Sequence, residues 1–195
     1  VDSDEKARNI AKRRQVETVA PEGLSRFLDA NADRIRGVIH MGAISATTES
    51  RLVRIIKNNI LLSRRLWHWC ADQGIPYIYA SSAATYGDGA QGFDDDGAIE
   101  ALKALKPLNL YGWSKNQFDI WVAEQVAAGA PRPPGWAGLK FFNVFGPNEY
   151  HKGRMQSVAR QVYENAARGE ACTLFKSHNP DYPDGGQLRD FVWVG

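Results

Sequence analysis

The sequence has little that would direct the chain to a membrane, to nucleic acid or into a disulfide framework. Its apolar runs are short and interrupted, so none could span a bilayer. The 24 lysines and arginines nearly balance 22 aspartates and glutamates, which excludes a strongly basic surface for nucleic acid or lipid. The two cysteines, Cys70 and Cys172, lie far apart without metal-ligand neighbours, so we expect reduced core thiols in a cytoplasmic protein.

What is present is the composition of a globular protein with alternating helices and strands. Hydrophobic residues make up 44% of the 195 residues and charged residues 24%. Apolar residues that recur at helical spacing predict helices, and short continuous runs of apolar residues predict strands. We expect helices over 21–28, 48–73, 109–126 and 155–168, a loop over 87–97, and strands over 37–43, 76–80, 139–144, 173–175 and 189–194.

This order of elements predicts an α/β fold, a Rossmann-like doubly wound parallel sheet with helices on both faces. Ligands of such sheets bind beyond the carboxyl ends of the strands. We expect a dinucleotide-binding domain over 1–145 and the start of a smaller substrate domain, with a returning strand, over 146–195.

The strongest local signal is Tyr111 followed four residues later by Lys115, inside a predicted helix. Residues four apart share one helix face. A tyrosine hydroxyl, whose pKa is ordinarily about 10, is a poor base, but a nearby ammonium favours the phenolate. Ser82, at the end of the preceding strand, is placed to share a substrate alcohol with Tyr111, although Ser81 and Ser82 could instead only cap or turn the chain.

Four segments carry a family resemblance: YASSAATYG at 79–87, PLNLYGWSK at 107–115, FNVFGPNEYHKG at 142–153 and GAISATTE at 42–49. The first two resemble the extended short-chain dehydrogenases/reductases. The last two are similar to the ADP-L-glycero-D-manno-heptose 6-epimerases, and the resemblance runs over 1–195. It implies inversion of a secondary alcohol carbon on an ADP-linked heptose, in the supply of nucleotide heptose for the lipopolysaccharide core, through a transient ketone and return of a hydride.

The resemblance also implies residue roles. Tyr111 would be one acid/base and Lys152 the second, on the opposite face of the sugar; Lys115 would support Tyr111 and hold the cofactor ribose; Ser82 would bind the substrate hydroxyl. The remaining cofactor contacts would come from Asp2, Lys6, Met41, Gly42, Ala43, Ile44, Ser45, Asn59 and Val144, with Lys152. The substrate contacts would come from Asn143, Arg154, Gln161, Phe175, Lys176, Ser177, His178 and Arg189, with Ser82.

The match is incomplete in three places. No G-x-G-x-x-G turn occurs for the cofactor pyrophosphate, so we expect a chain that begins after the first strand and helix and ends inside the substrate domain. Asp2 favours NAD, whereas Lys6 and Arg8 could neutralise the 2′-phosphate of NADP; we expect NADP, with NAD as the alternative. Arg154 and Gln161 stand where the family has serine and histidine.

Two other functions remain open at this point. One is an epimerase or dehydratase of another nucleotide sugar, such as a UDP-hexose; Ala83 and Ala84, where dehydratases carry acids, count against dehydration. The other is a non-catalytic dinucleotide-binding relative, which the presence of both Tyr111 and Lys115 disfavours. We expect a homo-oligomer.

Overall fold

The computed structural model describes residues 4–11, 17–177, 180–188 and 190–195. The chain divides into two compact units, Val19–Phe141 and a second unit made of Val1–Thr18 with Phe142–Gly195. Asp2, His178 and Arg189, expected in the site, lie outside the described residues. The expected domains, 1–145 and 146–195, stay a prediction.

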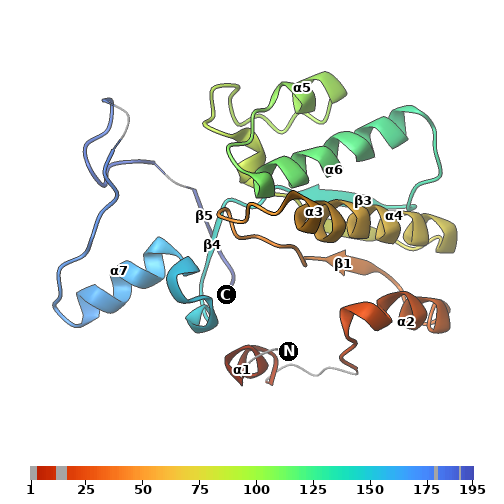
Figure 1. Cartoon of the computed structure of the whole chain (residues 1–195), viewed down its shortest axis with the longest axis horizontal. Coiled ribbons are helices and arrows are strands. Elements are labelled where there is room, and N and C mark those ends of the chain that lie inside the picture. The colour runs from red at the N-terminus through yellow and green to blue at the C-terminus, as the bar shows by residue number, and fades with distance from the viewer. Residues whose placement is uncertain (1–3, 12–16, 178–179, 189) are drawn as a thin grey trace. The chain divides into compact units, whose positions relative to one another are not determined.

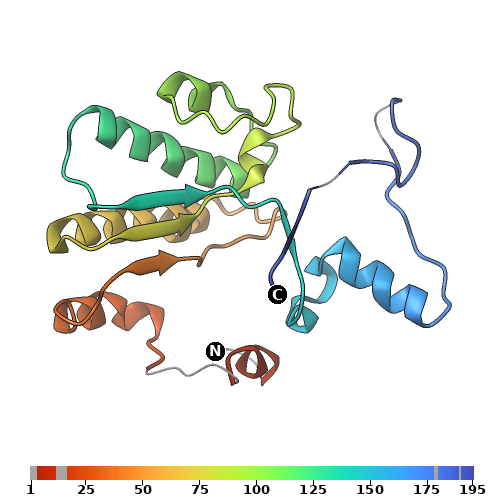
Figure 2. The ribbon, with the colours of Figure 1, turned by 180° about the vertical axis from the view of Figure 1, so that it is seen from behind.

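The unit 19–141 is built on a parallel sheet with strand order β1-β2-β3. Its strands are β1 (Val38–His40), β2 (Tyr77–Ala80) and β3 (Trp136–Leu139). His40 pairs with Tyr79, and Tyr79 with Gly138. Figures 1 and 2 show α3 and α4 end to end, as one long helix that runs beside α6 along this sheet. Its helical segments are η1 (Pro21–Gly23), α2 (Leu24–Ala30), α3 (Leu52–Ile55), η2 (Ile56–Leu61), α4 (Leu62–Gln73), η3 (Ala83–Tyr86), α5 (Ile99–Ala104) and α6 (Leu110–Ala127).

The core lies between the sheet and the helices α4 and α6. Side chains alternate between the two faces of a strand, and Tyr77 and Tyr79 of β2 point towards the helices. Tyr79 meets Phe118 of α6 edge-on, with 4.8 Å between ring centroids, and Trp67 of α4 meets Tyr77 at 6.2 Å. Gly138 of β3 is required here, because a Cβ on it would overlap the Tyr79 hydroxyl.

The opposite face of this sheet carries exposed apolar side chains. Ile39 of β1 is 71% exposed and its partner Ile78 of β2 is 36% exposed. Among the described residues, the helices therefore bury only one face of the sheet, and not both faces as the sequence analysis predicted.

The long predicted helix over 48–73 contains an unpredicted π-helical segment, η2. Its hydrogen bonds span five residues where an α-helix spans four, and such segments often occur at functional sites. Asn59 and Ile60 in this segment are both buried. The helix ends, as predicted, at Gly74, which adopts φ = 63°.

A buried histidine makes the stability of this unit depend on pH. Ser63 donates its hydroxyl hydrogen to the Asn59 carbonyl at 2.6 Å, so the His40 Nε2, 3.2 Å from the Ser63 oxygen, must be the donor. Burial, with the charge of Lys115, lowers the pKa of His40 to about 4. The neutral ring is therefore the folded form at neutral pH.

Because an unfolded histidine titrates near pH 6.5, the unfolded chain binds an extra proton between about pH 6.5 and pH 4, and stability falls as the pH falls through this window. We expect His40→Gln, which retains an amide donor, to remove about 2 kcal/mol of the stability lost between pH 7 and pH 5, measured by urea unfolding. His68→Gln on the exposed side of α4 is the control. Equal pH dependence in wild type and His40→Gln would contradict the assignment.

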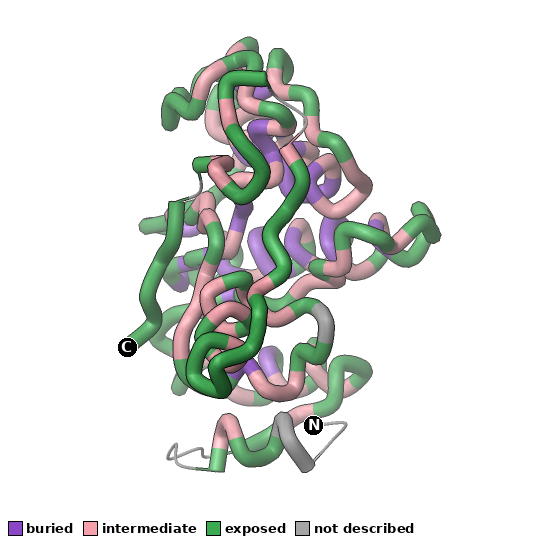
Figure 3. The backbone as a smooth tube through the Cα atoms, turned by 90° about the vertical axis from the view of Figure 1, so that its left-hand side faces the viewer, coloured by how far each residue is buried: buried purple, intermediate pink, exposed green. Residues whose placement is uncertain are grey.

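The second unit contains a two-stranded parallel sheet of β4 (Asn143–Phe145) and β5 (Phe191–Trp193). Its helices are α1 (Asp4–Ala11), η4 (Tyr150–Met155) and α7 (Val158–Ala167). Asn9 of α1 contacts His151 Nδ1 at 2.9 Å. Figure 3 shows that most residues outside the core helices are exposed or intermediate. Among the described residues of this second unit, Glu149 is the one that is buried.

Two expectations about local structure were wrong, and one helix was missed. The strand expected over 139–144 is divided, since β3 ends at Leu139 and β4 begins at Asn143. No strand forms over 173–175, where the exposed Leu174 and Phe175 have no neighbouring strand in the described part of the chain. The loop expected over 87–97 is present, and the helix α5 that follows it, whose Leu102 is buried, was not predicted.

Candidate active site

The predicted pair Tyr111 and Lys115 lies on one side of α6. The side chain of Asn109 caps this helix by accepting from the Gly112 N–H at 2.9 Å, which places Tyr111 in the first turn. Lys115 stands one turn later, and its Nζ lies 5.9 Å from the centre of the Tyr111 ring. The amine and the phenol thus share one region, as their spacing predicted.

Lys115 is buried against the end of β2. Its Nζ donates to the Ala80 carbonyl at 2.6 Å. Burial lowers the pKa of Lys115 to about 8, although the neighbouring charge of Asp119 acts in the opposite direction. The amine is mostly charged at pH 7, and the described residues supply one acceptor for its three hydrogens.

Ser82 lies two residues after the end of β2 and directly before η3. Its Oγ accepts from the Ala84 N–H at 3.1 Å, so the serine caps this short helix. A hydroxyl oxygen that accepts one hydrogen bond can still donate its own hydrogen. The cap is therefore compatible with the predicted contact to a substrate hydroxyl, which stays a prediction.

Gly112 allows α6 to approach η3 closely. A Cβ at this position would lie 2.5 Å from the Ala84 carbonyl oxygen, a contact with backbone that cannot move aside easily. We expect Gly112→Ala to destabilise the protein by about 1–3 kcal/mol and to move Tyr111 away from Ser82, with a lower melting temperature and loss of catalytic activity. Gly97→Ala, whose Cβ meets nothing within 4 Å, is the control. Unchanged melting temperature and activity in Gly112→Ala would contradict this packing argument.

The expected cofactor strand end, Met41 to Ser45, is held by Asn59. The Asn59 Oδ1 accepts from the Ile44 N–H at 2.9 Å, and its Nδ2 donates to the Ile44 carbonyl at 3.0 Å. The same Nδ2 donates to the Ser114 Oγ at 3.0 Å, and Ser114 donates to the Tyr111 carbonyl at 2.7 Å. Asn59 is almost fully buried, so it connects the strand end to the tyrosine helix.

The groups around this strand end fit a nicotinamide dinucleotide. Met41, Gly42 and Ser45 are exposed beyond the carboxyl end of β1, where a parallel sheet binds its ligand. Gly42 would allow close approach of a ligand to the backbone, and Lys115 retains hydrogens for ribose oxygens. Lys6 lies in α1, and its side chain is outside the described part of the structure.

Lys152 lies in η4, in the other unit, so its pairing with Tyr111 stays a prediction. Its Nζ is 3.5 Å from the Glu149 carboxylate. Glu149 accepts from the Gly146 N–H at 3.0 Å, the Ser157 N–H at 2.7 Å and the Ser157 hydroxyl at 2.8 Å. Burial raises the pKa of Glu149, but these hydrogen bonds and Lys152 outweigh it, so the pKa lies below its ordinary value. An ionised Glu149 thus anchors the loop that presents the partly exposed Lys152.

The other predicted contacts of this unit are spread along its surface. Asn143 donates to the Asp190 carbonyl at 3.0 Å, and the adjacent Val144 is half-buried. Gln161 of α7 is exposed and donates to the Gln156 carbonyl at 2.8 Å. The exposed residues Phe175 and Lys176 precede Ser177, and Arg154 lies in η4 with its side chain outside the described structure. Their roles stay predictions.

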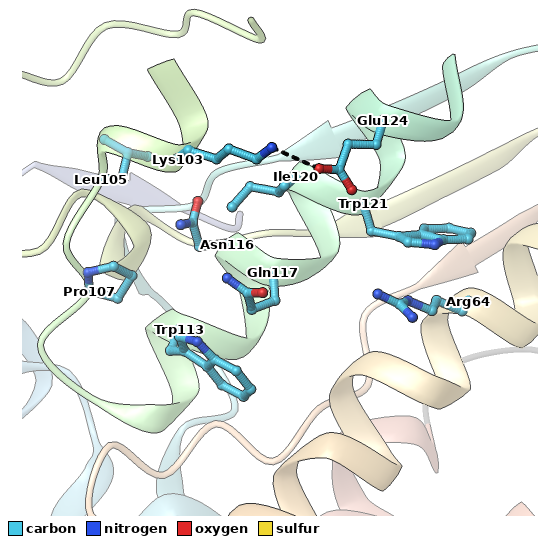
Figure 4. Close-up of a pocket in the computed structure, with 10 residues that line it drawn as sticks. All are labelled: Arg64, Lys103, Leu105, Pro107, Trp113, Asn116, Gln117, Ile120, Trp121 and Glu124. Atoms are coloured by element: carbon cyan, nitrogen blue, oxygen red, sulfur yellow. Dashed lines mark ion pairs between the residues drawn. The ribbon is translucent and has the colours of Figure 1, made fainter. Parts of the chain in front are cut away.

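A hollow of about 310 Å³ lies on the other side of α6 from Tyr111 and Lys115. Figure 4 shows the Lys103–Glu124 ion pair, 2.9 Å long, across its rim. At 100° per residue, the lining residues Trp113, Gln117 and Trp121 face away from the Tyr111 stripe. No predicted site residue lines this hollow.

One acidic residue near Lys115 was missed by the sequence reasoning. Asp119 is buried one helical turn beyond Lys115 and accepts from Tyr79 and Ser81. Extending the four-residue spacing of Tyr111 and Lys115 by one step would have found it.

The Tyr111–Lys115 pair and the strand end held by Asn59 fit a site for a nicotinamide dinucleotide, and comparison with known proteins gives the family of the chain. The NAD dependent epimerase/dehydratase family matches residues 1–195, and the chain belongs to this family. The ADP-L-glycero-D-manno-heptose-6-epimerase of Fusobacterium nucleatum is 47% identical over 193 residues, covering 98% of this chain and 57% of that relative. The resemblance inferred from the motifs is thereby confirmed.

Solved structures agree with this assignment. The Helicobacter pylori ADP-L-glycero-D-manno-heptose-6-epimerase has a TM-score of 0.70 and 28% identity, covering 95% of this chain and 54% of that one. MoeE5, in complex with UDP-glucuronic acid and NAD, has a TM-score of 0.62 and 26% identity, covering 93% and 58%. The predicted Rossmann-like parallel fold is confirmed, and the chain spans little more than half the length of these relatives. Among the described residues, no helix has both the length and the apolar character needed to cross a bilayer.

Proposed function

We propose that the protein converts ADP-D-glycero-D-manno-heptose into ADP-L-glycero-D-manno-heptose with the aid of a bound nicotinamide dinucleotide. The observation that carries the proposal is the arrangement at the end of β2. Tyr111 and Lys115 share one side of α6, and Gly112 brings this helix against the segment that Ser82 begins. The names of the F. nucleatum and H. pylori relatives support the choice of sugar.

The inverted carbon bears a secondary alcohol with no adjacent carbonyl, so its C–H is too weakly acidic for direct removal as a proton. When bound, the dinucleotide supplies reversible removal of that hydrogen as hydride, which leaves a transient ketone. Tyr111 takes the hydroxyl proton on one face, and Ser82 holds the same oxygen by a hydrogen bond. Lys115 keeps a positive charge near the phenol. Lys152 returns a proton to the oxygen when the ketone presents its other face.

The proposal includes the identity of the cofactor, the residues that contact each ligand and the setting in which the protein acts. We infer NADP as the cofactor, with Asp2 and Lys6 at its ribose and Met41 to Ser45, Asn59 and Val144 lining it. Asn143, Arg154, Gln161, 175–178 and Arg189 contact the nucleotide sugar. The protein acts in the cytoplasm as a homo-oligomer, in the supply of heptose for the lipopolysaccharide core.

The test is incubation of the full-length protein with ADP-D-glycero-D-manno-heptose and a catalytic amount of NADP⁺, followed by chromatographic separation of the two epimers. We expect a mixture of both epimers and no net NADPH. Failure to convert the sugar, by protein shown to hold its cofactor, would sink the heptose assignment. A panel of UDP-, GDP- and dTDP-sugars would then identify the substrate.

A further inference from the structure

A buried carboxylate, Asp119, continues the stripe formed by Tyr111 and Lys115 on α6. Its Oδ1 accepts from the Tyr79 hydroxyl at 3.0 Å, and its Oδ2 accepts from the Ser81 hydroxyl at 2.5 Å. The two donors belong to β2 and to the residue just after it, about 40 positions earlier in the chain. Asp119 is therefore the point at which α6 is tied to the end of β2.

The contacts indicate that Asp119 is ionised. Both of its oxygens act as acceptors, which is the behaviour of a carboxylate, and the bond to Ser81 has the length of a charge-assisted one. Burial holds the pKa of Asp119 above its ordinary value, although the bond from Ser81, the charge of Lys140, the bond from Tyr79 and the charge of Lys115 act in the opposite direction. Tyr79 remains a neutral donor, because burial and the Asp119 charge both raise its pKa.

The two donors flank the atom that Lys115 binds. Tyr79 and Ser81 lie on either side of Ala80, whose carbonyl accepts from the Lys115 Nζ at 2.6 Å. Ser82 follows directly. By holding Tyr79 and Ser81, Asp119 fixes the direction of the Ala80 carbonyl and the position of Ser82, two residues after the strand.

We propose that Asp119 is a positioning residue of the active site, which holds Ser82 and Lys115 in place and keeps the Lys115 amine charged. The proposal rests on the proposed function for its kinetic consequences, but not for its electrostatic ones. The hydrogen bonds of Asp119 reach neither Tyr111 nor the place of the reacting alcohol beside it; Asp119 acts through Ser81, Ala80 and Lys115.

Other titratable groups face Lys115 and Asp119. Lys115 faces His40 of β1 as well as Asp119, and Asp119 faces Lys140 as well as Lys115. Lys140 in turn lies 4.5 Å from the centre of the Tyr86 ring. Because burial keeps His40 neutral and the charge of Lys140 favours the ionised form of Asp119, Asp119 is the negative charge among these groups. Removal of this negative charge should lower the pKa of Lys115, so that the amine loses its proton at a lower pH.

The first arm of the test measures kinetics of the full-length Asp119→Asn protein against wild type. We expect kcat to fall on the order of 10- to 100-fold from misplaced groups, with KM for the sugar changed less than about threefold. The alkaline limb of the kcat profile should move to lower pH. Asp119→Glu should restore that limb but not the full kcat, because its longer side chain displaces Tyr79 and Ser81. Glu124→Gln, a half-buried acid on the same helix, is the matched control.

The second arm follows the titration of Lys115 directly, by NMR of protein labelled with [ε-¹³C]lysine, with Lys115→Met to assign the signal. We expect the Lys115 midpoint to move down in Asp119→Asn by about half a pH unit or more, and to stay in place in Glu124→Gln. An unmoved midpoint would overturn the proposal whatever the substrate proves to be.

The two arms separate the possible failures. Wild-type protein that does not convert the heptose counts against the proposed function, and the NMR arm still decides the role of Asp119. Should Asp119→Asn fail to fold, Ser81→Ala removes one donor while leaving the carboxylate; it should lower kcat and leave the Lys115 midpoint unchanged. A wild-type kcat in Ser81→Ala would overturn the positioning role.

Discussion

Replacement of Lys115 by methionine is expected to lower the kcat of the full-length protein on the order of 100-fold or more, even with saturating cofactor. Methionine retains the length and the apolar stem of lysine but removes the charge beside the Tyr111 ring and the bond to the Ala80 carbonyl. Steady-state conversion of the heptose measures the effect. Lys103→Met, an exposed lysine paired with Glu124, is the control.

The same variant should not be less stable, so lost activity cannot be attributed to unfolding. The pKa of Lys115 is lowered to about 8, from about 10.5 in an unfolded chain, because its charged form is costly to bury. Below pH 8 that cost is fully present, and it disappears as the pH rises from 8 to 10.5. Methionine removes it at every pH. We therefore expect an equal or higher melting temperature at pH 7; wild-type turnover in the variant would remove Lys115 from the mechanism.

Tyr111→Phe is expected to lower kcat by about 10²- to 10⁴-fold, the usual contribution of a positioned acid/base. The substitution deletes one oxygen and leaves the ring beside Lys115. Because the Lys115 amine bonds to Ala80 and not to the phenol, the lysine should keep its position, and the protein should retain its cofactor.

Cofactor content after purification and epimer conversion, measured on the same sample, test this expectation. Tyr163→Phe on the exposed side of α7 is the matched control. A variant that retains both its cofactor and wild-type turnover would show that another group takes the proton. Lys152 would then be the first residue to examine.

The sequence predicted most elements that have a strong local pattern. The helix expected over 109–126 occurs at Leu110–Ala127, and the strand expected over 76–80 occurs at Tyr77–Ala80. The strand expected over 139–144 was misplaced, because Phe141 and Phe142 extend an apolar run across the boundary between the two units. Apolar runs report burial, and they do not report which strand a residue will pair with.

In the candidate site, too, local contacts could be predicted from the sequence and long-range contacts could not. The closeness of Tyr111 and Lys115 follows from helical spacing alone, and the structure has it. The bonds from Asp119 to Tyr79 and Ser81 join segments about 40 residues apart, so no local pattern could reveal them. The connection of Ile44 to Ser114 through Asn59 depends likewise on the packing of η2 against α6.

The π-helical segment Ile56–Leu61 has a consequence for how this protein can change in length. A π-helical segment holds one more residue than the α-helix it interrupts, because its hydrogen bonds span five residues and not four. One residue removed from this segment would therefore return it to an α-helix and leave the residues on either side facing as before. One residue removed from the first turn of α4 would instead turn every later residue by about 100°, and the fully buried Trp67 would no longer face the core. In homologous sequences, a single-residue gap within this long helix should therefore fall in Ile56–Leu61 and not in α4.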